Sequence, residues 1–479
     1  MTRFVFGALF LLGCGAASVR GTSSDAGTQA EVSATQSGAT YERPIDLVFK
    51  IHFEPQTTLD QYKKRRDDIE AVRAIAEKYG IKLSIHGNGE FWQYAKEQGD
   101  EPIVRKWLAN GHIVGPHMHA VYEVSNHSWR TATFQQTADE AFVDDLWKQH
   151  EKYLTALLPD VKITSATPFD THDEQFVSRM NSRGYTIVGG GKEEISEQWL
   201  GHHPFHPWRV GGTFLEEDLS SKVILVTHYS QFLEQDYHGA LGSGAYADQS
   251  LAHHKVGFLQ IYLNRLYAER TGEPLDKVWS YGFMTHDTKS PADTRAEIEK
   301  YIVWVTTNFG QGKKSARGNV ILKPSTMQDV YDDFVGWEKE HPNTSSFNVK
   351  TPTVTGSQSI DALDESQRKA IYPGPFWGMA ELLRADEANV ADYVTQIDTF
   401  AAAGVSCHEI AVGPRGDTKR TRRFILWKET DGDAVIDMTS LTSSANVVRW
   451  NVRDKTSSSV AAIAIAVGGE PVIVDVSGP

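Results

Sequence analysis

The chain has 479 residues, 40% of them hydrophobic, and a formal net charge of −14. This acidic balance argues against nucleic acid as a partner and against a basic face that docks on a membrane. Only two cysteines occur, Cys14 and Cys407, so a disulfide framework is excluded. What remains after the first forty or so residues is long enough to bury a large core and to form more than one domain.

The amino terminus has the layout of a secretory signal. Arg3 precedes an apolar core from Phe4 to Leu12, which is too short to span a bilayer. The residues Leu11-Leu12-Gly13 before Cys14 resemble the lipobox of bacterial lipoproteins, which implies cleavage before Cys14 and lipidation of that cysteine. An ordinary signal peptide cleaved a few residues later is the alternative. We therefore expect an exported lipoprotein of the bacterial cell envelope that meets the membrane through its lipid only.

Residues 15–42 are rich in Gly, Ser, Thr, Ala and Gln and lack bulky apolar side chains, so we expect a flexible tether. Cys407 lies in a strand-like context, and we expect a small buried residue there rather than a nucleophile.

From residue 43 to residue 341, apolar strands alternate with amphipathic helices. This order predicts a parallel sheet, and the number of units favours a barrel, (β/α)7–8, over an open sheet. The predicted strands cover 46–53, 81–86, 161–166, 185–188, 222–228, 278–285 and 319–323. The predicted helices cover 59–79, 102–110, 137–158, 173–183, 251–270 and 292–308.

Residues 342–479 have a different pattern of apolar and polar residues. A polar, Pro-containing stretch at 343–359 reads as a linker or long loop, and helices are expected at 361–371 and 389–403. The short alternating segments that follow, at 422–427, 434–438, 446–452, 460–467 and 470–476, predict an antiparallel sheet or sandwich. We expect an accessory α+β region that packs against the barrel or binds glycans.

Polar side chains gather at the ends of the predicted strands. His117 and His119 are spaced i, i+2, so in an extended segment both point the same way and can hold one divalent metal. Glu54, Asp170 and His286 also follow predicted strands, and in a barrel the chemistry lies at the carboxyl ends of the strands. The alternatives are a buried, paired carboxylate at Glu54, a packed histidine at His286, and a helix cap at 171–173.

The order of these motifs resembles that of the polysaccharide deacetylases, the NodB-type carbohydrate esterases, over roughly residues 45–340. The resemblance implies a barrel of deacetylase type with Glu54 at a metal-ligand position and Phe53 where the family has its base Asp. Gly111 to Val121 is similar to the family's histidine motif, with His117 at its first metal histidine. The second falls on Val121, so His119 must substitute for it.

The resemblance also extends to Thr167–Asp170 and to Met284–Asp287. It implies that His286 is the general acid. Because the base Asp is absent, either His52, Asp170 or another carboxylate activates water, or the activity has changed or been lost. The resemblance implies a divalent metal, expected to be zinc, held by Glu54, His117 and His119. Such an ion lowers the pKa of bound water toward ~7.

The function predicted on these grounds is a metal-dependent hydrolase that removes N- or O-acetyl groups from a carbohydrate. The segment 201–209 has the composition of a substrate-facing lid, in which Trp208 would stack on a sugar ring and Arg209 would hold an acidic group. His172 is a further candidate for substrate binding.

Two other classes of function stay open. One is a glycoside hydrolase that uses Glu54 with Asp170 or Asp287 as a carboxylate pair. The other is a non-catalytic glycan-binding lipoprotein that kept the barrel and lost the base. Metal content separates the deacetylase from the glycosidase.

Overall fold

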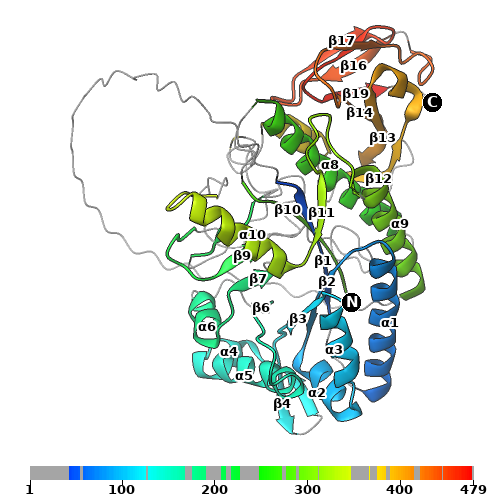
Figure 1. Cartoon of the computed structure of the whole chain (residues 1–479). Coiled ribbons are helices and arrows are strands. Elements are labelled where there is room, and N and C mark those ends of the chain that lie inside the picture. Colours follow the sequence, from blue (N-terminus) through cyan, green and yellow to red (C-terminus); the bar gives the residue numbers. More distant parts are fainter. Residues whose placement is uncertain are drawn as a thin grey trace, which may run out of the picture. The chain divides into compact units, whose positions relative to one another are not determined.

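The computed structural model describes most of the chain after residue 42 (Figure 1). The described residues are 43–53, 55, 58–125, 128–167, 175–189, 206–211, 217–226, 247–271, 277–286, 291–310, 312–346, 366, 375–383, 389–414, 421–444 and 446–476. The predicted signal peptide, Cys14 and the tether at 15–42 lie outside this part of the chain. Residues from Tyr41 onward form one compact unit.

A parallel sheet is built around strand β1 (Ile45–His52). On one side β1 pairs with β10 (Trp279–His286) along its whole length. On the other side its first half pairs with β11 (Leu322–Ser325) and its second half with β2 (Leu83–Gly87). Next in order, β2 pairs with β3 (Ile113–Pro116). Because these strands are parallel, their carboxyl ends meet at one edge.

A second sheet continues this series. It contains β6 (Ser165–Ala166), β7 (Ile187–Gly189) and β9 (Ile224–Val226), all parallel, with β8 (Trp208–Arg209) antiparallel at the edge. A parallel bridge between His117 and Thr167 joins β3 to β6. The described strands thus form a mixed α/β fold with a parallel sheet, and no pairing among them closes the predicted barrel.

Helices cover the outer face of the first sheet. Leu47, Phe49 and Ile51 of β1 join their side chains in one core with residues of α1, α8 and α9. The helices of this region are α1 (Leu59–Lys78), α2 (Gly89–Gln98), α3 (Glu101–Ala109), α4 (Phe134–Thr137), α5 (Glu140–Leu157), α6 (Phe176–Arg183), α8 (Ala247–Thr271), α9 (Pro291–Phe309) and α10 (Met327–Glu340). A short hairpin, β4 (Val121–Ser125) and β5 (Ser128–Thr131), follows β3.

Local sequence explains where several helices begin. Thr58 and Gln61 form a reciprocal capping box at α1, and Thr326 and Asp329 form another at α10. The Asn88 side chain accepts a hydrogen bond from the Phe91 N–H and so caps α2. The polar sequence Gly87-Asn-Gly, which predicts a loop, is therefore the cap of a helix.

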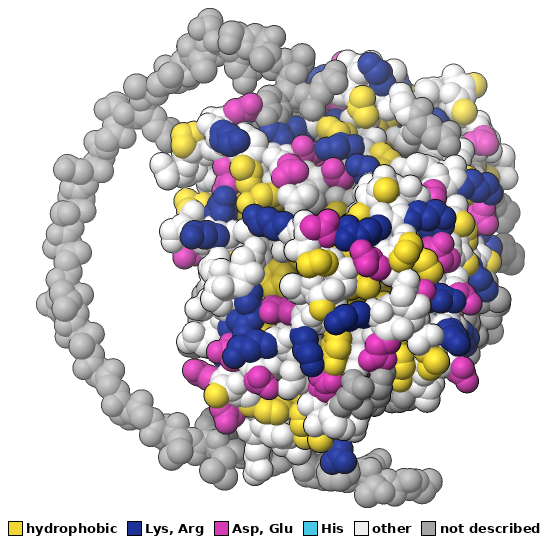
Figure 2. Space-filling model, turned by 60° about the horizontal axis from the view of Figure 1, so that its bottom comes forward, with side chains coloured by type: hydrophobic (Ala, Val, Ile, Leu, Met, Phe, Trp, Pro, Cys, Tyr) yellow, Lys and Arg dark blue, Asp and Glu magenta, His cyan; other side chains and the backbone are white. Residues whose placement is uncertain are grey.

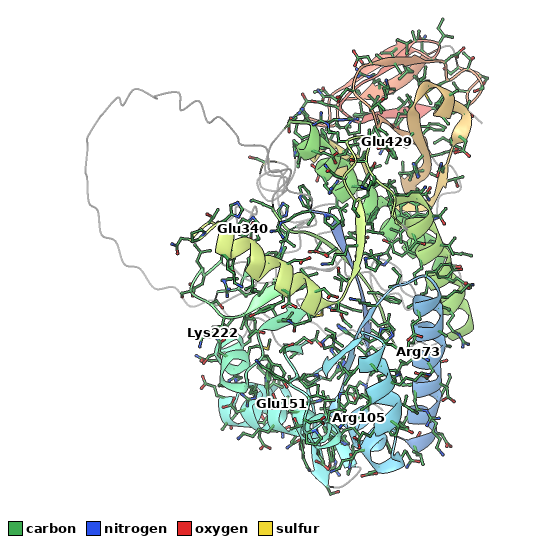
Figure 3. All side chains as sticks on the ribbon, viewed as in Figure 1. Arg73, Arg105, Glu151, Lys222, Glu340 and Glu429 are labelled. Atoms are coloured by element: carbon green, nitrogen blue, oxygen red, sulfur yellow. The ribbon has the colours of Figure 1, made fainter. Side chains whose placement is uncertain are left out.

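Charged side chains on α1 pair with one another and with the residues before β3. Arg73 on α1 forms ion pairs with Glu70 and Glu77 of the same helix (Figure 3). Glu77 in turn accepts from His112 Nε2 at 2.9 Å, and His112 Nδ1 accepts from the Leu83 N–H. Positive and negative side chains alternate over the face shown in Figure 2. None of the helices in the described part of the chain is both long and apolar enough to cross a membrane.

The carboxyl-terminal region is mainly β-structure. Six strands form an antiparallel sheet in the order β12-β13-β14-β19-β16-β17, and β15 pairs with β18. Their bounds are β12 (Asn389–Gln396), β13 (Val405–Pro414), β14 (Thr421–Lys428), β15 (Ala434–Ile436), β16 (Asn446–Trp450), β17 (Ser457–Ala461), β18 (Ile465–Val467) and β19 (Val472–Val476). Helix α12 (Trp377–Leu383) and a 3-10 helix, η2 (Asp398–Ala403), accompany them.

Two predictions for this region can be compared with the structure. The helix predicted at 389–403 is wrong, because these residues form β12 and η2. Cys407 is 1% exposed within an apolar cluster, and burial raises the pKa of its thiol to about 12, which confirms a buried structural residue. The predicted helix at 361–371 lies almost wholly outside the described residues.

Candidate functional site

A polar inner face of the parallel sheet leads to the site. Side chains alternate along β1, so Asp46, Lys50 and His52 lie on the face opposite Leu47, Phe49 and Ile51. All three polar residues are at least nine-tenths buried. Asp46 lies at the amino end, where its carboxylate accepts from Ser325 at 2.6 Å. His52 is the last residue of β1, at the carboxyl edge.

Three histidines meet at this edge. The ring of His52 stacks on that of His117, with centroids 4.3 Å apart and planes 23° from parallel. The ring of His119 stands at 89° to His117, with centroids 4.6 Å apart. His52 comes from β1, whereas His117 and His119 follow β3. The pair predicted to act together, His117 and His119, is therefore adjacent in space, and His52 joins it.

Thr167 holds His117 in place. Its hydroxyl oxygen lies 2.9 Å from His117 Nδ1, and the His117 N–H donates to the Gly87 carbonyl at 2.7 Å. The Thr167 hydroxyl also lies 3.4 Å from the Pro116 carbonyl. When this hydroxyl donates to Pro116, His117 donates through Nδ1–H and carries its lone pair on Nε2, the arrangement that metal-binding histidines commonly show.

A second polar pair lies beneath the three histidines. His86, the neighbour of His52 on β2, is fully buried, and its Nε2 lies 3.0 Å from the Ser165 hydroxyl. Burial, and then the positive charge of Lys50, lowers the pKa of His86 to about 3. Burial also lowers the pKa of Lys50 well below its ordinary value. Burial thus disfavours the charged forms of the His86 ring and the Lys50 amine.

Gly115 allows β3 to approach His86. A Cβ at position 115 would lie 2.6 Å from His86 Cδ2 and against the Ser165 carbonyl. Contacts this short do not occur at real Cβ atoms, so any side chain here would push His86 and β6 away. The glycine therefore sets the spacing of the strands that carry the histidines.

His150 on α5 fixes the backbone around the site. Its Nδ1 accepts from the Gly89 N–H and its Nε2–H donates to the Val121 carbonyl, both at 2.9 Å. Gly89 begins α2, and Val121 lies two residues after His119. Burial lowers the pKa of His150 to about 4, so the ring is neutral and able to make both bonds.

The described residues include part of a donor set for a metal ion. His117 and His119 supply two adjacent imidazoles, and the contact to Thr167 suits a ligand histidine. Within the described ranges, however, no three His, Cys, Asp or Glu side chains form a group that can hold a metal. The third predicted ligand, Glu54, lies outside the described residues. The structure places His117 and His119 side by side, and the ligand set as a whole stays a prediction.

The side chains of the other predicted catalytic residues lie outside the described part of the chain. His286 lies at the end of β10 in register with His52, but its side chain is outside the described part, as are Asp170, His172 and Asp287. His206, from the predicted lid, is buried and its Nδ1 lies 2.8 Å from the Val278 carbonyl. It is a structural residue.

The substrate-binding roles expected of Trp208 and Arg209 need correction. Trp208 is 1% exposed and packs in an apolar cluster, so its ring has no open face for a sugar. Arg209 forms a bidentate ion pair with Glu338 of α10, at 2.5 and 2.6 Å, and donates to the Ser221 carbonyl. Both residues attach β8 to its neighbours.

Residues missed from the sequence include Lys50, His86 and Ser165. Their signal was present in the predicted strands, because each lies at a position whose parity matches His52 or His117 along its strand. Marking polar residues at alternate positions of otherwise apolar strands would have found them.

Comparisons with known proteins give the following. No family model matches the chain, and no curated protein matches it. Solved structures do match. A Mycobacterium smegmatis protein named as a polysaccharide deacetylase is 10% identical, with a TM-score of 0.40, and the match covers 62% of this chain and 92% of that one. A Pseudomonas aeruginosa PAO1 protein, likewise named, is 13% identical, with a TM-score of 0.40 and coverages of 63% and 93%.

The allantoinase PuuE also matches, at 13% identity and a TM-score of 0.39, with coverages of 64% and 94%. The first two of these structures carry the name of the family whose motifs the sequence resembles. Because these identities and TM-scores are low, we build the following proposal on the residues of this chain.

Proposed function

We propose that this protein is a metal-dependent hydrolase that removes acetyl groups from a carbohydrate. The observation that carries the proposal is the meeting of His52, His117 and His119 at the carboxyl edge of a parallel sheet, with Thr167 on His117 Nδ1. In α/β folds this edge is where catalytic side chains gather.

In this proposal His117, His119 and Glu54 hold one divalent metal, and zinc is the ion that best suits two imidazoles and a carboxylate. Such an ion supplies a water of lowered pKa and polarises the carbonyl of the acetyl group. Thr167 orients the ring of His117, which keeps one nitrogen directed at the site.

Proton transfers fall to the remaining residues. His286 ends the strand paired with β1, in backbone register with His52 at the same edge of the sheet. We assign it the donation of a proton to the departing amine or alcohol. Asp170 or His52 accepts the proton of the attacking water. His52, stacked on His117, is close enough for this role.

The location proposed for this activity is the cell envelope. The sequence Leu11-Leu12-Gly13-Cys14 supports lipidation at Cys14, and the composition of residues 15–42 supports a tether. We also propose that residues 43–341 carry the activity and that residues 342–479 are an accessory region.

An acetate-release assay tests the proposal. Purified protein is incubated with acetylated xylan, N-acetylglucosamine oligomers and peptidoglycan, before and after treatment with a chelator and after zinc is restored. Release of acetate from one of these, lost with the chelator and recovered with zinc, is expected. Chelator-resistant release, or cleavage of glycosidic bonds without acetate, would contradict it, and the second result would favour the glycosidase.

A further inference from the structure

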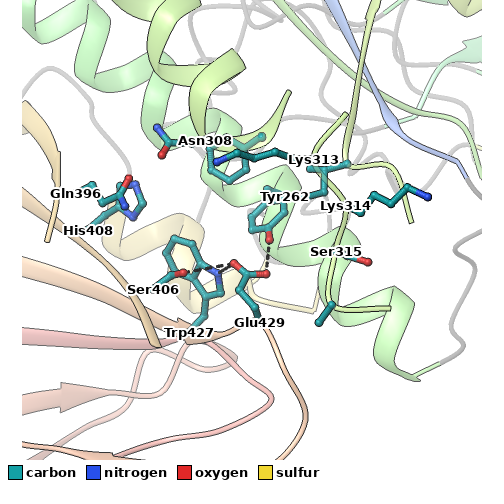
Figure 4. Close-up of a pocket in the computed structure, with 13 residues that line it drawn as sticks. Tyr262, Asn308, Lys313, Lys314, Ser315, Gln396, Ser406, His408, Trp427 and Glu429 are labelled. Carbon is teal, nitrogen blue, oxygen red and sulfur yellow. Dashed lines mark hydrogen bonds between the residues drawn. The ribbon is translucent and has the colours of Figure 1, made fainter. Parts of the chain in front are cut away.

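A cavity of about 390 Å³ is lined by residues other than the three histidines. Figure 4 shows this cavity. Helices α8 and α9, the loop after α9 and strands β12, β13 and β14 wall it. Ile321, on its wall, immediately precedes β11, so the cavity lies by the amino edge of the parallel sheet. Its volume is that of a site for a small molecule. Its lining includes Tyr262, Asn308, Phe309, Lys313, Lys314 and His408.

His408 is the most informative residue of this cavity. The side chain comes from β13, is 3% exposed, and stacks on Trp427 with ring centroids 5.2 Å apart and planes 15° from parallel. Neither of its ring nitrogens has a hydrogen-bond partner in the part of the chain that the structure describes. Buried polar groups are normally satisfied, so a ligand or water in the cavity is the expected partner.

The protonation of His408 limits what it can bind. Burial, and then the positive charge of Lys255, lowers the pKa of the ring to about 4. A neutral imidazole offers one N–H donor and one lone pair, the pairing that a hydroxyl group can meet from either side. The ring therefore suits a hydroxylated ligand better than a bare anion.

The other acid and hydroxyl groups of the lining are already bonded. Glu429 accepts from Tyr262 and from the Trp427 indole, each at 2.6 Å, and Ser406 lies 3.4 Å from the same carboxylate (Figure 4). The Ser315 hydroxyl donates to Glu269. Glu429 is thus part of the wall and holds β14 to α8.

Charge at this cavity is opposite in sign to that of the whole chain. Two exposed lysines, Lys313 and Lys314, line it against the single carboxylate of Glu429, in a chain of net charge −14. No ion pair of either lysine occurs within the described residues. Tyr262, Phe309 and Trp427 are buried in the wall of the cavity and give it a rigid apolar lining.

We propose that this cavity binds an acidic sugar, a uronic acid unit, whose hydroxyls bond to His408 and whose carboxylate lies by Lys313, the lysine whose amine points toward His408 in Figure 4. The choice of a sugar rests on the proposed function, whereas the existence of the site rests on His408 and the cavity. The site would hold an acidic polysaccharide while the histidine edge acts on another part of it.

Calorimetric titration of the full chain with D-glucuronate tests this, with D-glucose and acetate as comparison ligands. Glucuronate is expected to bind at least tenfold more tightly than either. The His408→Leu variant is expected to lose at least tenfold in affinity for glucuronate. A Lys313→Ala/Lys314→Ala double variant should bind glucuronate no better than glucose, and the exposed control Lys339→Ala should behave as wild type.

Absence of glucuronate binding by the wild type, or equal binding by the double lysine variant, would overturn the site. Acetate binding as tight as glucuronate binding would overturn the sugar and leave an anion site only. The His117→Ala variant separates this inference from the proposed function, because it should keep glucuronate binding even if no acetate release is ever found.

Discussion

Replacing His150 with Leu should destabilise the protein strongly at neutral pH. The substitution leaves the Gly89 N–H and the Val121 carbonyl buried without the ring that now bonds both at 2.9 Å. Each unsatisfied group costs roughly 1–3 kcal/mol, so a loss of about 2–5 kcal/mol is expected near pH 7. Acetate release should fall too, because Val121 lies two residues after His119.

The same substitution should behave differently in acid. The pKa of His150 is about 4 in the folded protein, against an ordinary value of 6.5. Unfolding therefore takes up a proton between these pH values, and the wild type loses stability as pH falls from 6.5 to 4. The difference of about 2.5 units corresponds to roughly 3 kcal/mol. The Leu variant has no such group, so the difference in free energy of unfolding between wild type and variant should shrink by about that amount.

Urea unfolding of both proteins at pH 7, 6, 5 and 4.5 measures this difference in the free energy of unfolding. Leu146→Ala, on the same helix, is the control, because it removes a buried apolar side chain and the loss of unfolding free energy that it causes should not change with pH. A His150→Leu deficit that stays constant over this range would refute the buried neutral ring, and a deficit below ~1 kcal/mol at pH 7 would refute its two bonds.

Three further predictions concern other parts of the molecule. Thr167→Val should weaken zinc binding by about 10–100-fold, because it removes the contact to His117 Nδ1. The buried control Thr306→Val should leave zinc affinity unchanged. Titration with a zinc-buffering dye measures both affinities, and equal values for the two variants would contradict the role of the contact. Arg209→Ala should lower the free energy of unfolding by about 1–3 kcal/mol, because it removes the ion pair with Glu338. KM for the best substrate should stay the same. A raised KM with unchanged stability would instead indicate a role in substrate binding. Cys14→Ala should move the protein from the membrane fraction to a soluble exported fraction. Wild-type protein whose mass shows no attached lipid would contradict the proposed lipidation of Cys14.

The sequence predicted β1, β2, β10 and β11 of the first sheet because each is a bounded apolar run. It also predicted the His117 and His119 pair, because two residues apart in an extended segment share a side. Helix α2 was missed because Gly87-Asn-Gly has turn composition, whereas Asn88 there caps a helix. Helix α10 was missed although Thr326 and Asp329 form a capping box.

Two errors came from burial, which composition does not reveal. Trp208 and Arg209 have the chemistry of a sugar site, but one is packed in a core and the other is paired with Glu338. Strand β12 was read as a helix because the Ala-rich segment after it, which forms η2, favours helical structure locally. Tertiary pairing with β13 decides its conformation.

Metal content of purified protein tests the central claim most directly. Elemental analysis by mass spectrometry is run on wild type, on His117→Ala, and on His341→Ala as a control at the end of α10. The proposal predicts about one zinc per chain in the wild type and the control, and less than a tenth of that in His117→Ala, because two ligands bind too weakly. A wild type that holds no metal even after incubation with zinc, or a His117→Ala variant that keeps it in full, would contradict the metal site.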